Sequence, residues 1–131
     1  MKILIADDDF FTRISLKSTL EQFGRCDMVT NGVEALEIFI DAYESGNAYR
    51  LVILDIQMPG MDGVEALKNI RQYEKDSKIP PKEEATIFMV TALDTPSTIV
   101  RTFMDGGCTD YIIKTNALLQ LPEKVKEHGL V

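Results

Sequence analysis

The sequence predicts a single α/β domain, built as a doubly wound sheet of five parallel strands with helices on both faces. Short runs rich in β-branched and large apolar residues alternate along the chain with stretches that have the period of amphipathic helices. The apolar runs lack polar alternation, which is typical of parallel strands buried on both faces. A length of 131 residues fits one domain with a core of its own.

Each expected strand is a short and continuous apolar run. The second run carries the weakest signal of the set. In chain order, the expected strands are Ile3–Ala6, Met28–Thr30, Leu51–Leu54, Thr86–Thr91 and Tyr111–Ile113.

The expected helices are marked by apolar residues three or four positions apart, with polar residues on the opposite side. Such stripes fill the intervals between the strands and follow the last one. In chain order, the stripes are Leu16, Leu20 and Phe23; Ala35, Leu36, Phe39, Ile40 and Tyr43; Val64, Leu67 and Ile70; Ile99, Val100, Phe103 and Met104; and Leu118, Leu121 and Val125.

Capping and breaking residues set the expected helix boundaries. Asp62 is a plausible N-cap for the third helix, and the fourth is expected to start at Pro96 and stop at Gly106–Gly107. Pro122 should confine the regular part of the last helix to a late start. The charged, proline-containing segment Lys75–Ala85 is interpreted as a solvated loop.

The net charge limits the classes of partner. Twenty-one acidic residues against 14 basic ones give a net charge of -7, which disfavours direct binding to nucleic acid or to an anionic membrane surface. The first apolar run, Ile3–Ala6, is too short for a signal-peptide core or a membrane span. We therefore expect a soluble, cytoplasmic protein.

The cysteines and the single histidine are assigned no chemistry at this point. Cys26 and Cys108 form neither a disulfide framework nor a paired metal motif, so both are expected to be small core residues. His128 is expected to be a surface residue without a partner.

Polar residues follow four of the expected strands. The segment Asp7-Asp8-Asp9 follows the first, Asp55 follows the third, Thr91 ends the fourth and Lys114 follows the fifth. In a flavodoxin-like sheet of order 2-1-3-4-5, the first and third strands are neighbours and their carboxyl ends share one edge. Three carboxylates would then crowd together, and Mg²⁺ is the cofactor that suits such hard oxygen ligands.

This constellation is suited to phosphoryl transfer. Asp55 could act as the nucleophile and form an acyl phosphate, while Lys114 and the Thr91 hydroxyl would stabilise the phosphoryl oxygens. Taken singly, these residues have simpler explanations: Thr91 as an ordinary strand residue, Lys114 as a solvated edge charge, and Asp9 as a helix cap.

The motifs together resemble those of a response regulator receiver domain. They are Ile3-Leu4-Ile5-Ala6-Asp7-Asp8-Asp9, Leu54-Asp55-Ile56-Gln57-Met58-Pro59-Gly60-Met61-Asp62-Gly63, Val90-Thr91-Ala92 and Tyr111-Ile112-Ile113-Lys114. The resemblance covers residues 1–131 and leaves no room for an output domain. It therefore implies a stand-alone receiver of the chemotaxis type.

The resemblance implies a role for each site residue. A sensor histidine kinase or a phosphotransfer protein would phosphorylate Asp55, and the receiver would catalyse its own phosphorylation and dephosphorylation without being an enzyme on a separate substrate. Asp8 and Asp55 would bind Mg²⁺ directly with the Gln57 carbonyl, and Asp7 mainly through water. Thr91 and Tyr111 would act as the switch, and output would pass to an unknown downstream protein or onward along a phosphorelay.

Two positions bear on details of that chemistry. Thr115 follows Lys114 where receivers usually have a proline after a cis bond, which leaves the approach of Lys114 open. Gln57 and Leu93 match positions that tune phosphoryl lifetime, and the apolar Leu93 is expected to slow dephosphorylation relative to a Leu93→Glu variant.

Two other functions stay open as alternatives. Asp7 and Asp9 are spaced like the paired aspartates of haloacid-dehalogenase-type phosphatases, in which Asp7 would be the nucleophile. That hypothesis leaves the segment around Asp55 unexplained and lacks a later acidic metal motif. The second alternative is an interaction module that keeps the fold but is never phosphorylated.

Overall fold

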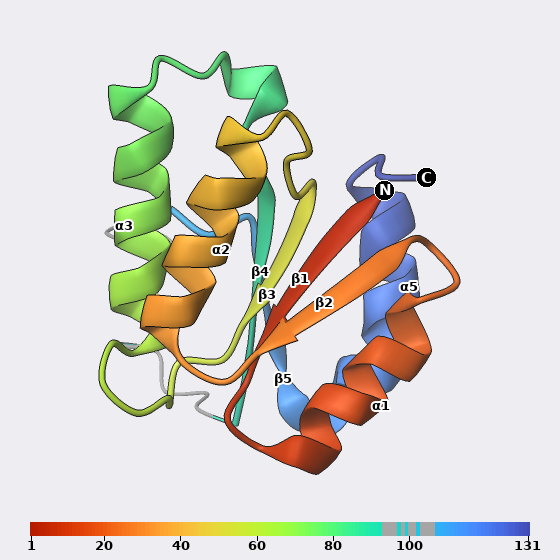
Figure 1. The fold of residues 1–131 in the computed structure, drawn as a ribbon. Helices are drawn as coiled ribbons and strands as arrows, with labels where there is room; N and C mark the ends of the chain where they lie inside the picture. The colour runs from red at the N-terminus through yellow and green to blue at the C-terminus, as the bar shows by residue number, and fades with distance from the viewer. Residues whose placement is uncertain (93–96, 98, 100–101, 103–106) are drawn as a thin grey trace.

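The computed structural model of the chain describes residues 1–92, 97, 99, 102 and 107–131. Its strands form one parallel sheet in the order β2-β1-β3-β4-β5 (Figure 1). The predicted fold class and strand order are thus confirmed. The strands are Lys2–Ala6 (β1), Arg25–Val29 (β2), Leu51–Leu54 (β3), Thr86–Thr91 (β4) and Asp110–Ile113 (β5).

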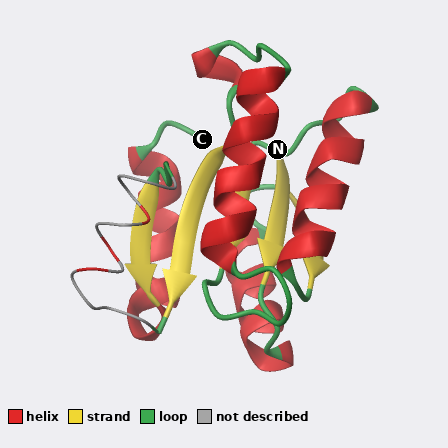
Figure 2. Ribbon diagram, turned by 90° about the vertical axis from the view of Figure 1, so that its left-hand side faces the viewer, coloured by secondary structure: helices red, strands yellow, loops and turns green. Residues whose placement is uncertain are grey.

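Helices cover both faces of the sheet (Figures 1 and 2). α1 (Phe10–Leu20) and α5 (Ala117–Glu127) lie on one face, and α2 (Gly32–Glu44) and α3 (Gly63–Asp76) lie on the other. Alternate residues of the central strands point to opposite faces, so the sheet separates two apolar cores. Ile53 packs in the core under α1 and α5, whereas Val52 and Leu54 pack under α2 and α3.

α1, α2 and α3 each begin with a side-chain cap. The carboxylates of Asp9 and Asp62 accept the backbone N–H groups of Thr12 and Glu65 at 2.8 and 2.9 Å, and Asn31 caps α2 in the same way. Such caps satisfy N–H groups that have no partner inside the helix. Asp9 and Asp62 are confirmed as caps, and the helices start at the carboxyl edge of the sheet.

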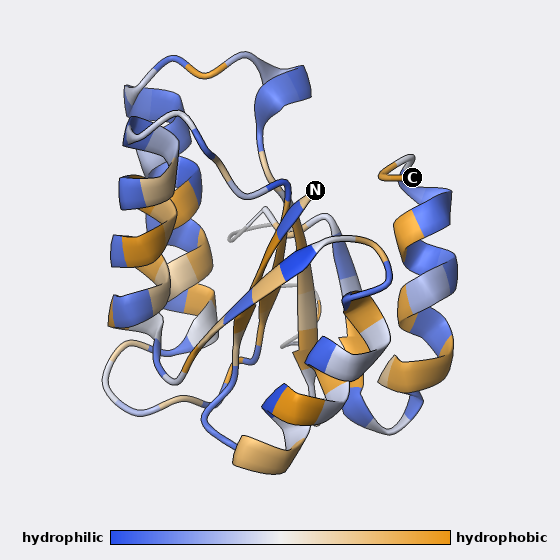
Figure 3. Ribbon diagram, turned by 45° about the vertical axis from the view of Figure 1, so that its right-hand side comes forward, coloured by the Kyte–Doolittle hydropathy of each residue, from blue (hydrophilic) through white to orange (hydrophobic). Residues whose placement is uncertain are grey.

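β2 starts three residues before the expected Met28, at Arg25. As an edge strand it is only partly covered, and polar side chains such as Asp27 interrupt its apolar pattern (Figure 3). A search for continuous apolar runs misses such a strand because that pattern belongs to strands buried on both faces.

Two boundary predictions were wrong. Pro122 lies inside α5, which starts at Ala117. A proline at this position leaves the carbonyl of Leu118 without its N–H partner, and the helix nevertheless continues to Glu127. The expected loop Lys75–Ala85 contains the end of α3 and a 3-10 turn, η1 (Pro81–Glu83). Of the helix predicted from Pro96, the structure describes only residues 97, 99 and 102, so its bounds stay a prediction.

The two cysteines lie in or against the apolar core, as predicted, whereas His128 differs from its prediction. Cys108 is buried and Cys26 is partly buried against the core, where burial raises the pKa of the Cys26 thiol to about 11. The expectation that His128 has no partner is wrong. Its Nε2 lies 2.9 Å from Asp110 Oδ2, and its ring packs against Phe88. Among the described residues, no helix has the length and apolarity needed to cross a membrane.

Candidate functional site

The register of β1 and β3 brings the predicted acids together. Ala6 lies opposite Leu54, and the Asp55 N–H donates to the Ala6 carbonyl at 3.0 Å. Asp7 and Asp55 therefore leave neighbouring strands side by side, with exposed fractions of 1% and 4%. Each offers a carboxylate oxygen within 4.8 Å of the other and of an oxygen of the exposed Asp8. The predicted convergence of these acids is confirmed.

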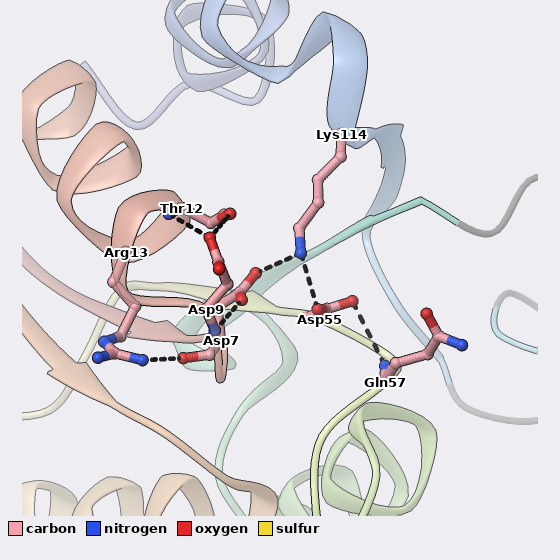
Figure 4. Close-up of polar contacts among 7 residues, drawn as sticks. All are labelled: Asp7, Asp9, Thr12, Arg13, Asp55, Gln57 and Lys114. Atoms are coloured by element: carbon pink, nitrogen blue, oxygen red, sulfur yellow. Dashed lines mark hydrogen bonds and ion pairs between the residues drawn. The ribbon is translucent and has the colours of Figure 1, made fainter.

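Lys114 places the ammonium that faces the buried acids. It follows β5 directly and begins a short 3-10 turn, η3 (Lys114–Asn116). Its Nζ lies 2.9 Å from Asp7 Oδ2 and 2.9 Å from Asp55 Oδ2 (Figure 4). No described peptide bond is cis, so Lys114 reaches both acids with a trans bond to Thr115.

Burial and charge act in opposite directions on these groups. Burial raises the pKa of Asp7, and the ion pair with Lys114 and the hydrogen bond from the Asp9 N–H only partly offset this. Burial also disfavours the Lys114 ammonium, but its contacts with Asp7 and Asp55 outweigh that effect and raise its pKa. Two buried carboxylates therefore share one ammonium, so the pair has one carboxylate more than the ammonium can neutralise.

The donor set fits a hard divalent cation. Asp7, Asp8 and Asp55 offer only oxygen ligands, which Mg²⁺ prefers, and the exposure of Asp8 leaves room for bound water. The buried Asp7 Oδ2 has the ammonium nearby but accepts no hydrogen bond of good geometry. In the described part of the chain, no second group of three potential ligand side chains meets in this way.

The loop after Asp55 is built to pass close to the site. Gly60 adopts a φ of 71°, which favours glycine, and the Gly63 N–H donates to the Ile56 carbonyl at 2.8 Å. A Cβ at Gly63 would overlap the Asp55 carbonyl oxygen. The Pro-Gly segment therefore has a defined role in bringing α3 against the strand that carries Asp55.

Gln57 lies at the rim of the site. Its backbone N–H is 3.4 Å from Asp55 Oδ1, while its side chain points away from the acids (Figure 4). The predicted contribution of its carbonyl to metal binding stays a prediction.

The predicted switch residues lie on β4, which pairs with β3, and on the edge strand β5. Thr91 ends β4 and is fully buried, and Tyr111 lies in β5, partly buried against the core under α2 and α3. Their roles stay predictions, and Leu93 lies outside the described residues.

Sequence reasoning missed Arg13, whose guanidinium donates to the Asp7 carbonyl at 2.8 Å (Figure 4). No spacing rule points to a hydrogen bond between a side chain and a backbone carbonyl. The available signal was a cation one helical turn after the Asp9 cap.

The chain is similar in sequence to a known protein family and to several of its members. The model of the response regulator receiver domain family matches residues 3–126. Hybrid signal transduction histidine kinase L of Dictyostelium discoideum is 32% identical over 129 residues, which cover 98% of this chain and 7% of the kinase. Response regulator MprA of Mycobacterium sp. (strain KMS) is 32% identical over 127 residues, which cover 96% of this chain and 49% of MprA. The chain thus spans less than two thirds of the length of either relative.

Solved structures share the fold. The receiver domain of the histidine kinase CKI1 from Arabidopsis thaliana, complexed with Mg²⁺ and BeF₃⁻, has a TM-score of 0.80 and 27% identity, with 96% of this chain and 87% of that chain covered. The co-crystal structure of the Saccharomyces cerevisiae histidine phosphotransfer protein Ypd1 with the Ssk1 receiver domain gives 0.82 and 29%, with coverage of 99% and 89%. With the family model matching nearly its whole length, the chain belongs to the response regulator receiver domain family.

Proposed function

We propose that this receiver accepts a phosphoryl group on Asp55 from a phosphohistidine, in a Mg²⁺-dependent reaction, and signals through a phosphorylation-dependent change in protein binding or by onward transfer. One observation carries the proposal: the buried Asp55 carboxylate lies beside Asp7 and shares with it the Lys114 ammonium, at 2.9 Å from each. The Mg²⁺ complex of the CKI1 receiver supports the choice of metal.

The chemistry requires no side chain beyond those at the site. An oxygen of Asp55 attacks phosphorus, a P–O bond forms, and the P–N bond breaks with its electron pair left on the imidazole of the donor. Lys114 holds a phosphoryl oxygen, and Asp7, Asp8 and Asp55 hold the cation, which neutralises charge on the transferring group when bound. Water later attacks the acyl phosphate, releases phosphate and restores the carboxylate. The chain would thus catalyse only its own modification and its reversal.

The surface beside the site supports docking of a protein donor. A groove of about 330 Å³ between α1 and α5 is lined by Phe11, Leu118 and Lys114 among others, so it reaches the site itself. Two of its lining residues, Phe11 and Leu118, are 77% and 52% exposed, so the groove presents apolar surface to solvent. The Ypd1–Ssk1 complex supports a histidine phosphotransfer protein as the donor. A sensor histidine kinase is the alternative donor.

The output is proposed to pass through Thr91 and Tyr111. Thr91 would move toward the phosphoryl oxygens and Tyr111 would turn inward, which would change the surface that a downstream protein recognises. The burial of Thr91 at the end of β4 and the partial burial of Tyr111 in the adjacent strand support this coupling.

Incubation with phosphoramidate and Mg²⁺, followed by peptide mapping, tests the proposal. We expect one phosphoryl group on Asp55, its loss in Asp55→Asn, and retained labelling in the matched variant Asp27→Asn, whose aspartate lies in the middle of β2. Labelling of Asp7 with turnover of phosphate monoesters would instead identify a phosphatase. A chain that takes no label and keeps its spectrum with Mg²⁺ and beryllofluoride would be a constitutive interaction module.

A further inference from the structure

We infer that Arg13 is a positioning residue, which orients the turn Asp7-Asp8-Asp9 so that the Asp8 carboxylate is presented to the divalent cation. The inference rests on the proposed metal-dependent function and adds a residue to it. Arg13 touches neither the cation ligands' carboxylate oxygens nor the phosphoacceptor. It acts through one backbone carbonyl.

Asp8 depends on its backbone for its position. Its side chain is exposed, and within the described part of the chain its carboxylate makes no hydrogen bond or ion pair. Asp7 and Asp55, in contrast, are buried and held by Lys114. The peptide units on either side of Asp8 therefore set where its Cα–Cβ bond points, because no contact of its own holds the carboxylate.

The residues on both sides of Asp8 are held firmly. The Asp7 N–H donates to the Val29 carbonyl at 3.2 Å, and the Asp9 N–H donates to Asp7 Oδ1 at 2.9 Å. Asp9 is fixed further because its carboxylate accepts from the N–H and hydroxyl of Thr12. The carbonyl of the Asp7–Asp8 peptide is held as well, because the Arg13 guanidinium donates to it at 2.8 Å.

The placement of Arg13 keeps it from competing with the cation. Its backbone N–H donates to the Asp9 carbonyl at 3.0 Å, and its guanidinium carbon lies 5.8 Å from the centre of the Phe10 ring. A guanidinium ordinarily prefers a carboxylate as its partner. Here, held between a ring and a carbonyl, it leaves the carboxylate oxygens available for the metal.

The direction in which substitution of Arg13 changes the Mg²⁺ dissociation constant distinguishes a positioning role from a purely electrostatic one. If charge alone mattered, removing the Arg13 guanidinium should tighten cation binding, because one repulsion between positive charges is lost. Removing the group that orients a ligand should weaken it, typically by about tenfold or more for residues that support a metal ligand. A role limited to the stability of α1 would change the unfolding midpoint and leave the Mg²⁺ dissociation constant where it was.

The experiment is calorimetric titration of the full chain with Mg²⁺ at fixed ionic strength, with the unfolding midpoint measured in parallel. We expect Arg13→Met to raise the dissociation constant about tenfold. Arg13→Lys keeps the charge, so any weakening in it reports geometry alone, and we expect a smaller rise. Arg25→Met removes the same charge at the amino end of β2 and should change the constant less than twofold.

Each outcome decides a different claim. Unchanged or tighter binding in both Arg13 variants, with the parent chain binding Mg²⁺, would overturn the positioning role and leave the proposed function intact. A parent chain that binds no Mg²⁺ would overturn the proposed function itself. If Arg13→Met fails to fold, Arg13→Lys alone decides the question.

Discussion

β5 has an ionic cluster at each end, and the two clusters differ in their balance of charge. At its start, the carboxylate of Asp110 faces Lys124 at 3.0 Å and His128 at 2.9 Å, and Lys124 also lies 3.5 Å from the exposed carboxylate of Glu127. Beyond its end, the single ammonium of Lys114 faces Asp7 and Asp55. The first cluster has more partners than its carboxylate needs, whereas the second has more carboxylates than its ammonium can neutralise.

The difference appears in the pKa values of the acids. Burial opposes ionisation of Asp110, but hydrogen bonds from His128, the Tyr111 N–H and Lys124 outweigh it, so the pKa of Asp110 is lowered. Burial also opposes ionisation of Asp7, and there it prevails and raises the pKa. A cluster that only ties α5 to the sheet can match its own charges, whereas a binding site keeps a surplus that its ligand neutralises.

The largest expected effect comes from removing the ammonium of the unbalanced cluster. Lys114→Met leaves Asp7 and Asp55 buried without a counter-charge, so the free energy of unfolding should fall by about 2 kcal/mol, less than for a fully buried pair because Lys114 is partly exposed. Urea denaturation without Mg²⁺ measures this, and saturating Mg²⁺ should restore part of the loss. If Lys114→Met were as stable as the parent without metal, the buried carboxylates would not need the ammonium for stability, which would contradict this account.

A smaller loss is expected at the balanced cluster. Asp110→Asn should lower the free energy of unfolding by about 1 kcal/mol at pH 7 and leave Mg²⁺ binding unchanged. Because the folded pKa of Asp110 lies below 3.8, its stabilisation is present at higher pH and disappears as the pH falls through that folded value. Denaturation curves of both chains should therefore converge in acid, and a constant difference would contradict the role given to the charge.

The smallest effect is a pH dependence of the opposite sign from Asp7. Its folded pKa lies above 3.8, so its contribution to stability is fully present below 3.8 and is lost as the pH rises through the folded value. In metal-free buffer, Asp7→Asn should gain stability relative to the parent as the pH rises through that value, because the variant has no buried carboxylate to ionise. The measurement is the free energy of unfolding of both chains from acid to neutral pH. If the variant gained stability relative to the parent as the pH fell, the raised pKa given to Asp7 would be wrong.

The sequence was sufficient for the sheet and for the acids but not for the contacts that support them. β3 and β4 were predicted residue by residue because strands covered on both faces are continuously apolar, and strand order then brings Asp7 to Asp55. Arg13 and His128 were missed for another reason. Their partners are a backbone carbonyl and an aspartate 18 positions away, which no local pattern marks.

Thermal unfolding with increasing Mg²⁺ tests most directly that the acid cluster is built to take up a cation. At ten times the dissociation constant, binding should stabilise the fold by about 1.4 kcal/mol and raise the midpoint by about 5 °C. The rise should vanish in Asp8→Asn and in Asp55→Asn and persist in Asp110→Asn. An unchanged midpoint in the parent chain, or a full rise in Asp55→Asn, would contradict this account.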